Sequence, residues 1–210
     1  MKRIIKKFIW DFLKRNPMLF LLVQFHRSRV KGLSDLGLVY KQFSCGGEEN
    51  SVAVDLGCGP NPRNPFGASK ALGVDLYEDE KKGILNCKLG FQKLPFDDGS
   101  VDYLTAYDLL EHIPRYSDNN EIGNAPFIFL MNECDRVLRK GGVFLSVTPI
   151  FPFLGAFQDP THNNIMTVDT LKLYFSNEKS PIASHYGINT NFVVAFQRLY
   201  GQHLVVVLRK

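Results

Sequence analysis

Short apolar runs rich in β-branched residues alternate with helical patterns along most of the chain, beginning at Ser51. Bounded by glycine, proline or polar residues, four of these runs predict strands: Val52–Leu56, Ala71–Leu76, Val101–Ala106 and Val143–Val147. A shorter apolar piece covers Asn86–Leu89. Because alternation of strands with helical segments is typical of an α/β fold, we predict a mostly parallel sheet flanked by helices.

Two helices and a terminal hairpin complete this pattern. Residues 126–142 begin with a proline, carry apolar side chains at helical spacing and end in two glycines, which predicts a helix over this range. A second predicted helix runs from Thr167, its cap, to Phe175. The strand-like runs Asn191–Leu199 and His203–Arg209 predict a C-terminal antiparallel hairpin that closes the sheet.

The first 31 residues have a different pattern, with apolar and basic side chains on opposite faces of a predicted helix. The apolar face carries Ile5, Phe8, Ile9, Phe12 and Leu13. Charged residues interrupt the apolar stretch, so we expect no signal peptide; the longest apolar run, Met18–Val23, is far shorter than the ~20 residues that cross a bilayer. The helix either packs on the rest of the chain or makes peripheral contact with an anionic membrane. We divide the chain into this basic amphipathic segment, residues 1–45, and a globular domain, residues 46–210.

Charge is distributed unevenly between these two parts. The chain has 210 residues, of which 45% are hydrophobic and 22% charged, as in ordinary globular proteins. Residues 1–31 hold nine of the 25 Lys and Arg residues but one of the 21 Asp and Glu residues, a net +8, which leaves −4 for the remainder. The basic character therefore belongs to the N-terminal segment, and we expect the domain not to bind nucleic acid.

The four cysteines show no spacing typical of a metal site or a disulfide framework. They are Cys45, Cys58, Cys87 and Cys134. No pair forms a C-x-x-C motif, and no histidine lies nearby at zinc-ligand spacing. We therefore expect reduced structural thiols, a cytoplasmic location and no metal site.

Candidate binding chemistry begins where the first predicted strand runs into Gly57-Cys58-Gly59. A Gly-x-Gly turn lets a ligand approach the backbone at the carboxyl edge of the sheet. Asp75 ends the next strand, where a carboxylate can accept hydrogen bonds from both hydroxyls of a ribose. Together they predict a nucleoside-bearing cofactor. NAD enzymes share this arrangement, but Pro62 replaces their third glycine and Asp55 would repel a phosphate, which favours a cofactor with an amino acid ammonium group.

Four segments, in this order, resemble class I S-adenosylmethionine-dependent methyltransferases. They are Asp55-Leu56-Gly57-Cys58-Gly59, Gly73-Val74-Asp75, residues 94–102 (LPFDDGSVD) and residues 136–142 (RVLRKGG). The resemblance implies a Rossmann-like fold with S-adenosyl-L-methionine as cofactor. It assigns Asp55, Gly57, Cys58 and Gly59 to the methionine end, Asp75 and Leu76 to the ribose side, and Tyr107 to the neighbourhood of the sulfonium.

The sequence also departs from the family pattern. A proline-rich stretch, residues 60–66, replaces the usual glycine-rich continuation, so the first helix is expected to begin late or to be missing. Gly90 stands where an acid is common, so the resemblance leaves adenine recognition to backbone groups of Gly90 and Phe91. The Asn-Pro-rich loop and Asp159-Pro160-Thr161-His162 resemble methyltransferases found with bacterial surface-polysaccharide biosynthesis.

Candidate catalytic residues follow from the chemistry of the acceptor. A sugar hydroxyl has a pKa far above neutrality, so a general base would accelerate its methylation by about 10²–10⁴-fold. His162, in the irregular loop after the predicted strand Val143–Val147, is our candidate base, with Asp159 nearby to orient it. His112 is the second candidate, although such a histidine often serves to start a helix.

The sequence thus predicts a methyltransferase that O-methylates a small-molecule or glycan-like acceptor. The alternatives are a methyltransferase of another small molecule, an inactive module that keeps the fold, and an NAD-dependent oxidoreductase. For the N-terminal segment, residues 1–31, we retain the hypothesis of peripheral contact with the inner membrane face.

Overall fold

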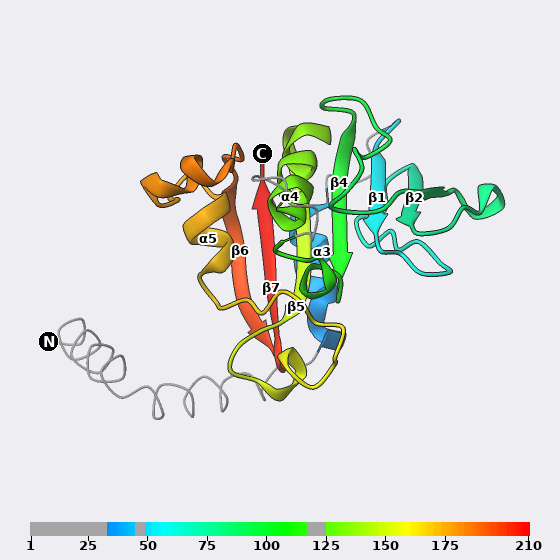
Figure 1. The fold of residues 1–210 in the computed structure, drawn as a ribbon. Coiled ribbons are helices and arrows are strands. Elements are labelled where there is room, and N and C mark those ends of the chain that lie inside the picture. The colour runs from blue at the N-terminus through cyan, green and yellow to red at the C-terminus, as the bar shows by residue number, and fades with distance from the viewer. Residues whose placement is uncertain (1–32, 45–48, 117–124) are drawn as a thin grey trace, which may run out of the picture.

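A seven-stranded sheet organises the part of the chain that the computed structural model describes, residues 33–44, 49–116 and 125–210 (Figure 1). Its strand order is β3-β2-β1-β4-β5-β7-β6. The strands are β1 (Val52–Leu56), β2 (Lys70–Asp75), β3 (Ile84–Asn86), β4 (Val101–Tyr107), β5 (Leu138–Pro149), β6 (Val193–Tyr200) and β7 (His203–Arg209).

The pairing pattern confirms the predicted Rossmann-like α/β fold. Neighbouring strands from β3 to β5 pair in parallel, while β7 runs antiparallel between β5 and β6. The β6–β7 pair is the predicted C-terminal hairpin. Because parallel strands place their carboxyl ends at one edge, the segments that follow β1, β2, β4 and β5 meet there, at the lower edge of these strands in Figure 1.

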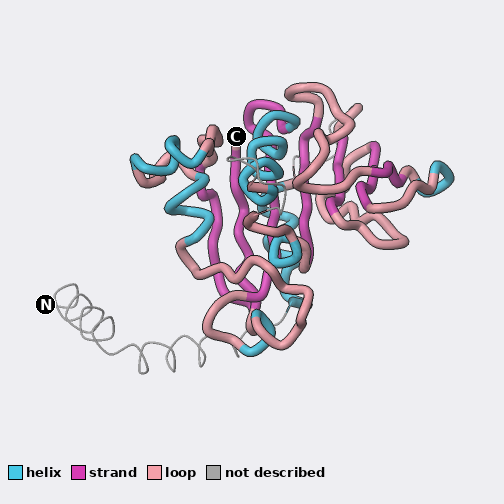
Figure 2. Tube along the Cα trace, in the orientation of Figure 1, coloured by secondary structure: helices cyan, strands magenta, loops and turns pink. Residues whose placement is uncertain are grey.

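Helices cover both faces of the sheet. On one face lie α4 (Pro126–Val137) and α5 (Thr170–Phe175), and on the other lies α3 (Gly37–Phe43), behind the sheet in Figures 1 and 2. Alternating strand residues separate accordingly: Val54 and Leu56 join the core under α4 and α5, whereas Ala53 joins the core under α3.

The stretch after β1 contains no helix among residues 57–69, as the proline-rich sequence predicted. Asn64 holds this loop in shape, since its side chain exchanges two hydrogen bonds of 2.9 Å with the backbone of Ala68. Phe66 is buried and stacks on Tyr103 of β4 with ring centroids 4.7 Å apart. The loop therefore covers the sheet where a helix would otherwise lie.

The observed boundaries differ from the predicted ones at several places. The helix predicted from Thr167 begins at Thr170, and the residue at its cap is Asp169 and not Thr167. β5 begins at Leu138, directly after α4, so Gly141-Gly142 lie in the strand and do not end the helix. Gly141 has a φ of 80° and donates its N–H to the carbonyl of Lys210, which places a backbone irregularity inside the strand. β3 lies at Ile84–Asn86 and not at Asn86–Leu89, because its pairing with β2 decides its position.

Two of the segments that carried the family resemblance stabilise the fold. Arg136 of α4 donates to Glu133, to Asp98 and to the carbonyls of Leu94 and Phe96, which fixes the 94–98 segment on the helix. Glu133 in turn accepts the N–H of Leu94 at 2.8 Å. Burial acts to raise the pKa of Glu133, but its hydrogen bonds with Arg136 and Leu94 outweigh this and hold the pKa below its usual range.

The N-terminal predictions lie outside the described residues. These are the amphipathic helix over residues 1–31 and the boundary at 45/46. The described part of this region, Leu33–Phe43, packs on the domain through Leu36, Val39 and Phe43. Among the described helices, none has the length and hydropathy needed to span a membrane.

Candidate active site

The turn after β1, residues Gly57–Gly59 (the β1 turn), depends on glycine at two positions. Gly57 has a φ of 62° and Gly59 a φ of 57°, in the left-handed region that favours glycine. A Cβ on Gly57 would lie 2.7 Å from Cδ1 of Leu109. The N–H of Gly57 donates to the carbonyl of Val74 at 2.8 Å. The β1 turn is therefore fixed on the end of β2.

Asp75, at the end of β2, is bonded to the β1 turn. One carboxylate oxygen accepts the N–H of Gly59 at 2.8 Å, and the other accepts the N–H of Leu76 at 2.7 Å. A carboxylate oxygen has two lone pairs, so each oxygen retains one for a further donor. The structure thus brings together Gly57, Cys58, Gly59 and Asp75, which the sequence had assigned to one site.

Asp55 is fully buried beneath the β1 turn. Its carboxylate accepts the Thr105 hydroxyl at 2.6 Å and the N–H of Arg63 at 2.9 Å. The Arg63 guanidinium lies 3.7 Å from Asp55 and over the ring of Tyr107, 4.6 Å from its centroid. Burial raises the pKa of Asp55, although the Thr105 and Arg63 contacts act in the opposite direction. The sequence predicted that a cationic group would lie beside Asp55. In the structure this group is the guanidinium of Arg63, a residue that sequence reasoning did not single out.

Tyr107, at the end of β4, is oriented away from solvent. Its hydroxyl donates to the hydroxyl of Tyr40 in α3 at 3.1 Å, and burial raises its pKa. The Arg63 guanidinium lies over the face of the ring. Tyr107 is therefore linked to Asp55 through Arg63.

The predicted adenine side carries exposed apolar side chains. Leu76 is 71% exposed, Tyr77 41% and Phe91 40%. Gly90 is buried with a φ of 85°, and a Cβ there would lie 3.0 Å from Pro126. The N–H of Phe91 donates to the carbonyl of Lys88 at 3.0 Å, within a turn. This region therefore offers a planar ligand apolar surface, with the Phe91 amide already hydrogen-bonded.

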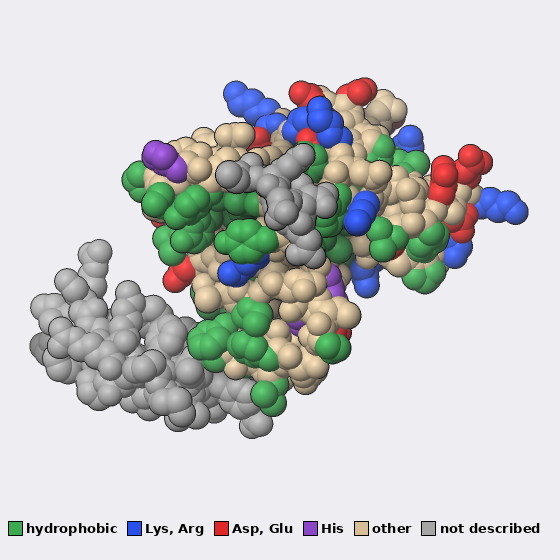
Figure 3. All heavy atoms as spheres, viewed as in Figure 1, with side chains coloured by type: hydrophobic (Ala, Val, Ile, Leu, Met, Phe, Trp, Pro, Cys, Tyr) green, Lys and Arg blue, Asp and Glu red, His purple; other side chains and the backbone are tan. Residues whose placement is uncertain are grey.

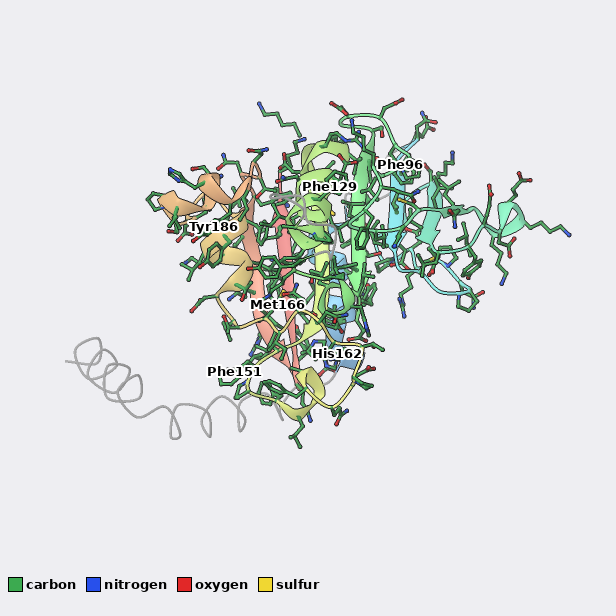
Figure 4. The ribbon with its side chains drawn as sticks, in the orientation of Figure 1. Phe96, Phe129, Phe151, His162, Met166 and Tyr186 are labelled. Carbon is green, nitrogen blue, oxygen red and sulfur yellow. The ribbon has the colours of Figure 1, made fainter. Side chains whose placement is uncertain are left out.

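A cavity of about 420 Å³ lies beyond the carboxyl ends of β4 and β5; we call it the β4–β5 pocket. Its walls come from the end of β4, the loop after β5 and the β6–β7 turn. They comprise Asp108, Glu111, His112, Pro149, Gly155, Gln158, Asp159, His162, Gln202 and His203. Figure 4 shows His162 in the loop below β5. A larger pocket, of about 660 Å³, lies around Leu94–Asp98 and Arg136 and contains none of the predicted site residues.

His112 and His162 come together in the β4–β5 pocket, although they lie far apart in the sequence. His112 also contacts Thr161, which is 49 residues away along the chain. The two imidazole centroids are 4.8 Å apart, in an edge-to-face arrangement. Backbone hydrogen bonds from Asn163 and Asn164 to the carbonyl of Glu111, at 2.8 and 2.9 Å, pin the second loop on the first. Both catalytic candidates thus face one cavity.

Asp159 contacts His162 less closely than the sequence suggested. The distance between Asp159 Oδ2 and His162 Nε2 is 3.9 Å, whereas His162 Nδ1 lies 3.3 Å from the carbonyl of Ala156. Asp159 instead accepts the Thr161 hydroxyl at 2.6 Å, and the Thr161 oxygen lies 3.0 Å from His112 Nδ1. Asp159 therefore orients His112 through Thr161.

Glu111 is the residue of this pocket that sequence reasoning missed. It is 1% exposed; Oε2 accepts the Thr148 hydroxyl at 2.5 Å, while Oε1 has no hydrogen-bond partner among the described residues. Burial raises the pKa of Glu111, against the effect of the Thr148 hydrogen bond. Its position next to His112, just after a strand, was the available sequence signal.

Comparison with known proteins finds a family match over part of the chain and a set of similar folds. The methyltransferase domain family matches residues 54–146. A SAM-dependent methyltransferase from Archaeoglobus fulgidus is 16% identical, with 84% of this chain and 92% of that chain covered and a TM-score of 0.52. Geranyl diphosphate C-methyltransferase from Streptomyces coelicolor A3(2) is 12% identical, with coverages of 84% and 75% and a TM-score of 0.50.

The cyclase SpnF has a similar fold too, at 12% identity, with coverages of 83% and 79% and a TM-score of 0.53. No curated protein sequence matches the chain. The fold is therefore shared by proteins that carry out different reactions. The match over residues 54–146, which contain the β1 turn and Asp75, is more specific: this part of the chain is similar to methyltransferase domains, and the solved structures that share its class I fold include SAM-dependent methyltransferases.

Proposed function

We propose that this protein transfers a methyl group from S-adenosyl-L-methionine to a hydroxyl of a small-molecule or glycan-like acceptor. The observation that carries the proposal is the juxtaposition of the β1 turn and Asp75 with the β4–β5 pocket, at one edge of one sheet. A nucleoside site next to a polar cavity is what transfer between a cofactor and an acceptor requires.

The residues of the cofactor side fit this cofactor in their chemistry. Asp75 is proposed to accept the ribose hydroxyls with its remaining lone pairs, and Leu76 flanks the nucleoside. Gly57, Cys58 and Gly59 present backbone to the methionine end. Gly90 and Phe91 form the adenine side, and Asp55 and Tyr107 act through Arg63, which they hold beside the turn.

The cofactor supplies an electrophilic methyl group on a sulfonium. The protein has to align the acceptor oxygen with that methyl group, exclude water and take up the hydroxyl proton. The β4–β5 pocket is lined by amide, carboxylate and imidazole side chains, which supports an acceptor with several hydroxyl groups, such as a sugar. We assign activation of the acceptor hydroxyl to His162 and His112, and we propose a role in polysaccharide biosynthesis.

Two measurements on the purified chain test this function. Calorimetric titration should show tight binding of S-adenosylhomocysteine and none of NADH, since the β1 turn lacks the third glycine of a dinucleotide site. Mass spectrometry should then detect a single added methyl group on a member of a panel of nucleotide sugars and short glycans. Tight NADH binding would reject the proposal, and cofactor binding without turnover on a broad panel would favour a non-catalytic module.

We further propose that the enzyme works in the cytoplasm, in peripheral contact with the inner membrane face, where lipid-linked acceptors would be available. Besides the basic residues 1–31, the loop that walls the β4–β5 pocket exposes apolar side chains: Phe151 is 48% exposed, Leu154 75% and Phe157 48%. Figure 3 shows green side chains gathered at the lower end of the molecule, where this loop lies in Figure 1. Exposed apolar side chains in a chain that also carries a cationic segment suit an anionic lipid surface.

Co-sedimentation with vesicles tests this location. The full chain should bind vesicles containing an anionic phospholipid and should bind neutral vesicles weakly. Deletion of residues 1–31 should abolish most of the binding, and Leu154→Ser should weaken it. Binding that is equal for the full and the shortened chain would contradict the role of the basic segment.

A further inference from the structure

The β4–β5 pocket contains a cluster of metal-ligating side chains that the proposed function does not require. Glu111, His112 and His162 each offer one ligand atom, and these atoms all lie within 4.8 Å of one another. A cation with ligand bonds of about 2.1 Å spaces its ligand atoms about 3.0–4.2 Å apart, so small side-chain shifts close the cluster around an ion. The three residues come from two distant loops, which explains why sequence spacing predicted no metal site.

The hydrogen bonds around His112 decide which of its nitrogen atoms can bind a cation. The Thr161 hydroxyl has a single proton, and it donates this proton to Asp159. The contact between Thr161 and His112 Nδ1 therefore requires Nδ1 to be the donor. In the neutral imidazole this leaves the lone pair on Nε2.

The same reasoning applies to His162. A carbonyl oxygen can only accept, so the 3.3 Å contact with Ala156 makes Nδ1 of His162 a donor and leaves the lone pair on Nε2. Histidine ligands in metal sites characteristically donate their second N–H to a carbonyl or to a hydrogen-bonded oxygen in this way. Both imidazoles are thus held in the tautomer that binds metal through Nε2.

Glu111 supplies the negative charge. Its Oε1 is buried and has no hydrogen-bond partner among the described residues, whereas Oε2 is fixed by Thr148. An unpartnered buried carboxylate oxygen costs free energy that a bound cation would offset. The other two acidic groups of the pocket already have partners: Asp108 lies 3.0 Å from His203 Nε2, and Asp159 accepts the Thr161 hydroxyl.

We propose that Glu111, His112 and His162 hold a divalent cation of the first transition series, such as Mn²⁺ or Zn²⁺, with positions left open for the acceptor. Two imidazoles and one carboxylate suit such a cation better than Mg²⁺, which prefers oxygen ligands. The site does not depend on the proposed function, but its role does. The acceptor hydroxyl binds the cation, which lowers the pKa of that hydroxyl, and its proton passes to water.

The oxygen then forms a bond to the methyl carbon. The carbon–sulfur bond breaks with its electron pair going to sulfur, so charge and atoms balance without a redox step. In this arrangement His162 and His112 activate the hydroxyl as metal ligands, and the Nε2 lone pair of His162 does not serve as a free base.

The site is tested on the full chain after removal of metals with EDTA and exchange into metal-free buffer. Calorimetry with Mn²⁺ and Zn²⁺ should show one equivalent bound, more tightly than Mg²⁺, and Co²⁺ should give the visible absorption of a nitrogen-ligated ion. Glu111→Gln and His162→Ala should each weaken Mn²⁺ binding at least ~10-fold. His185→Ala, which removes an exposed histidine outside the pocket, is the matched control and should leave binding unchanged.

S-adenosylhomocysteine affinity, measured on the same samples, separates this inference from the proposed function and shows that each variant is folded. Equal Mn²⁺ affinity in the unsubstituted chain, Glu111→Gln and His162→Ala would overturn the metal site while cofactor binding persists. Metal binding without binding of S-adenosylhomocysteine would leave the site standing and reject the methyltransferase proposal. Should Glu111→Gln fail to fold, Mn²⁺ binding by His162→Ala and the Co²⁺ spectrum of the unsubstituted chain still decide the outcome.

Discussion

The β1 turn and the β4–β5 pocket lie at the same edge of the sheet but differ in how far their polar groups are hydrogen-bonded. Around the β1 turn, Asp55 and Asp75 each have their oxygens occupied by donors of the chain itself, three of which are backbone N–H groups, one of them within the turn. In the pocket, Glu111 Oε1 lacks a partner among the described residues, and two imidazoles keep a lone pair on Nε2.

Under the proposed function, this difference separates a rigid binding surface from a reactive one. A site that binds a cofactor of fixed shape can be assembled in advance by backbone hydrogen bonds and left-handed glycines. A site that must activate an acceptor keeps ligand atoms available, at a cost in folding stability. The cofactor side should therefore respond to substitution through its backbone geometry, and the pocket through its unsatisfied charge.

The largest effect is expected for Gly57→Ala. The new methyl group requires a left-handed backbone and meets Leu109 Cδ1 at 2.7 Å, which together should lower the free energy of unfolding by about 2–4 kcal/mol. Binding of S-adenosylhomocysteine should be weakened as well. Chemical denaturation and calorimetry measure the two effects.

Gly67→Ala is the matched control for this substitution. Gly67 also has a positive φ, 70°, but a Cβ there has no neighbour within 4 Å. The Gly67→Ala variant should lose only the stability that the strain of a left-handed backbone costs. It should keep its affinity for S-adenosylhomocysteine. If Gly57→Ala and Gly67→Ala behaved alike, the β1 turn would not be rigid in the sense of this comparison.

The next largest effect is expected for Asp75→Ala, on cofactor affinity. Loss of a charged hydrogen-bond acceptor costs about 1.5–3 kcal/mol, so affinity for S-adenosylhomocysteine should fall roughly 10- to 100-fold by calorimetry. Glu78→Ala removes an exposed negative charge three residues away and should change affinity little. An unchanged affinity in Asp75→Ala would contradict the ribose role.

The contrast between the two regions also explains what the sequence could reveal. The β1 turn is a contiguous segment, and Asp75 ends the neighbouring strand, so a local pattern predicted both, together with the sheet and the hairpin. Gly141-Gly142 were mistaken for a helix end because the pairing of β5 with distant strands overrides local glycine signals. The proline-rich stretch after Gly59 correctly predicted the missing helix.

The pocket could be predicted only in part. His112 and His162 were candidates because each follows a predicted strand at the edge of the sheet expected to bind the cofactor, but their contacts depend on how the 150–165 loop returns to the end of β4. Glu111 was missed because its burial and its partner Thr148, 37 residues away, are tertiary facts. Arg63 was missed for the same reason, since a loop arginine gives no sign that it will lie over Tyr107.

The smallest effect, and the sharpest test of the comparison, is expected for Glu111→Gln in the metal-free chain. Glutamine keeps an acceptor for Thr148 and removes the buried charge, so it should stabilise the fold by about 1 kcal/mol at neutral pH. Because burial raises the pKa of Glu111, the folded state binds this proton more tightly than the unfolded state. The destabilisation of the fold by ionised Glu111 is therefore absent below the ordinary pKa range of carboxyl groups. It grows as pH rises through the raised pKa of Glu111.

The difference in unfolding free energy between Glu111→Gln and the unsubstituted chain should accordingly rise from near zero at acidic pH to its full value near neutrality. Asp55, whose pKa is also raised, is present in both chains and cancels in the difference. Saturating Mn²⁺ should reverse the order of stability, because a bound cation stabilises the chain that retains Glu111 more than the variant that binds it more weakly. Urea titrations across this pH range, with and without Mn²⁺, measure both; a pH-independent difference would show that Glu111 is no more strained than the carboxylates of the β1 turn.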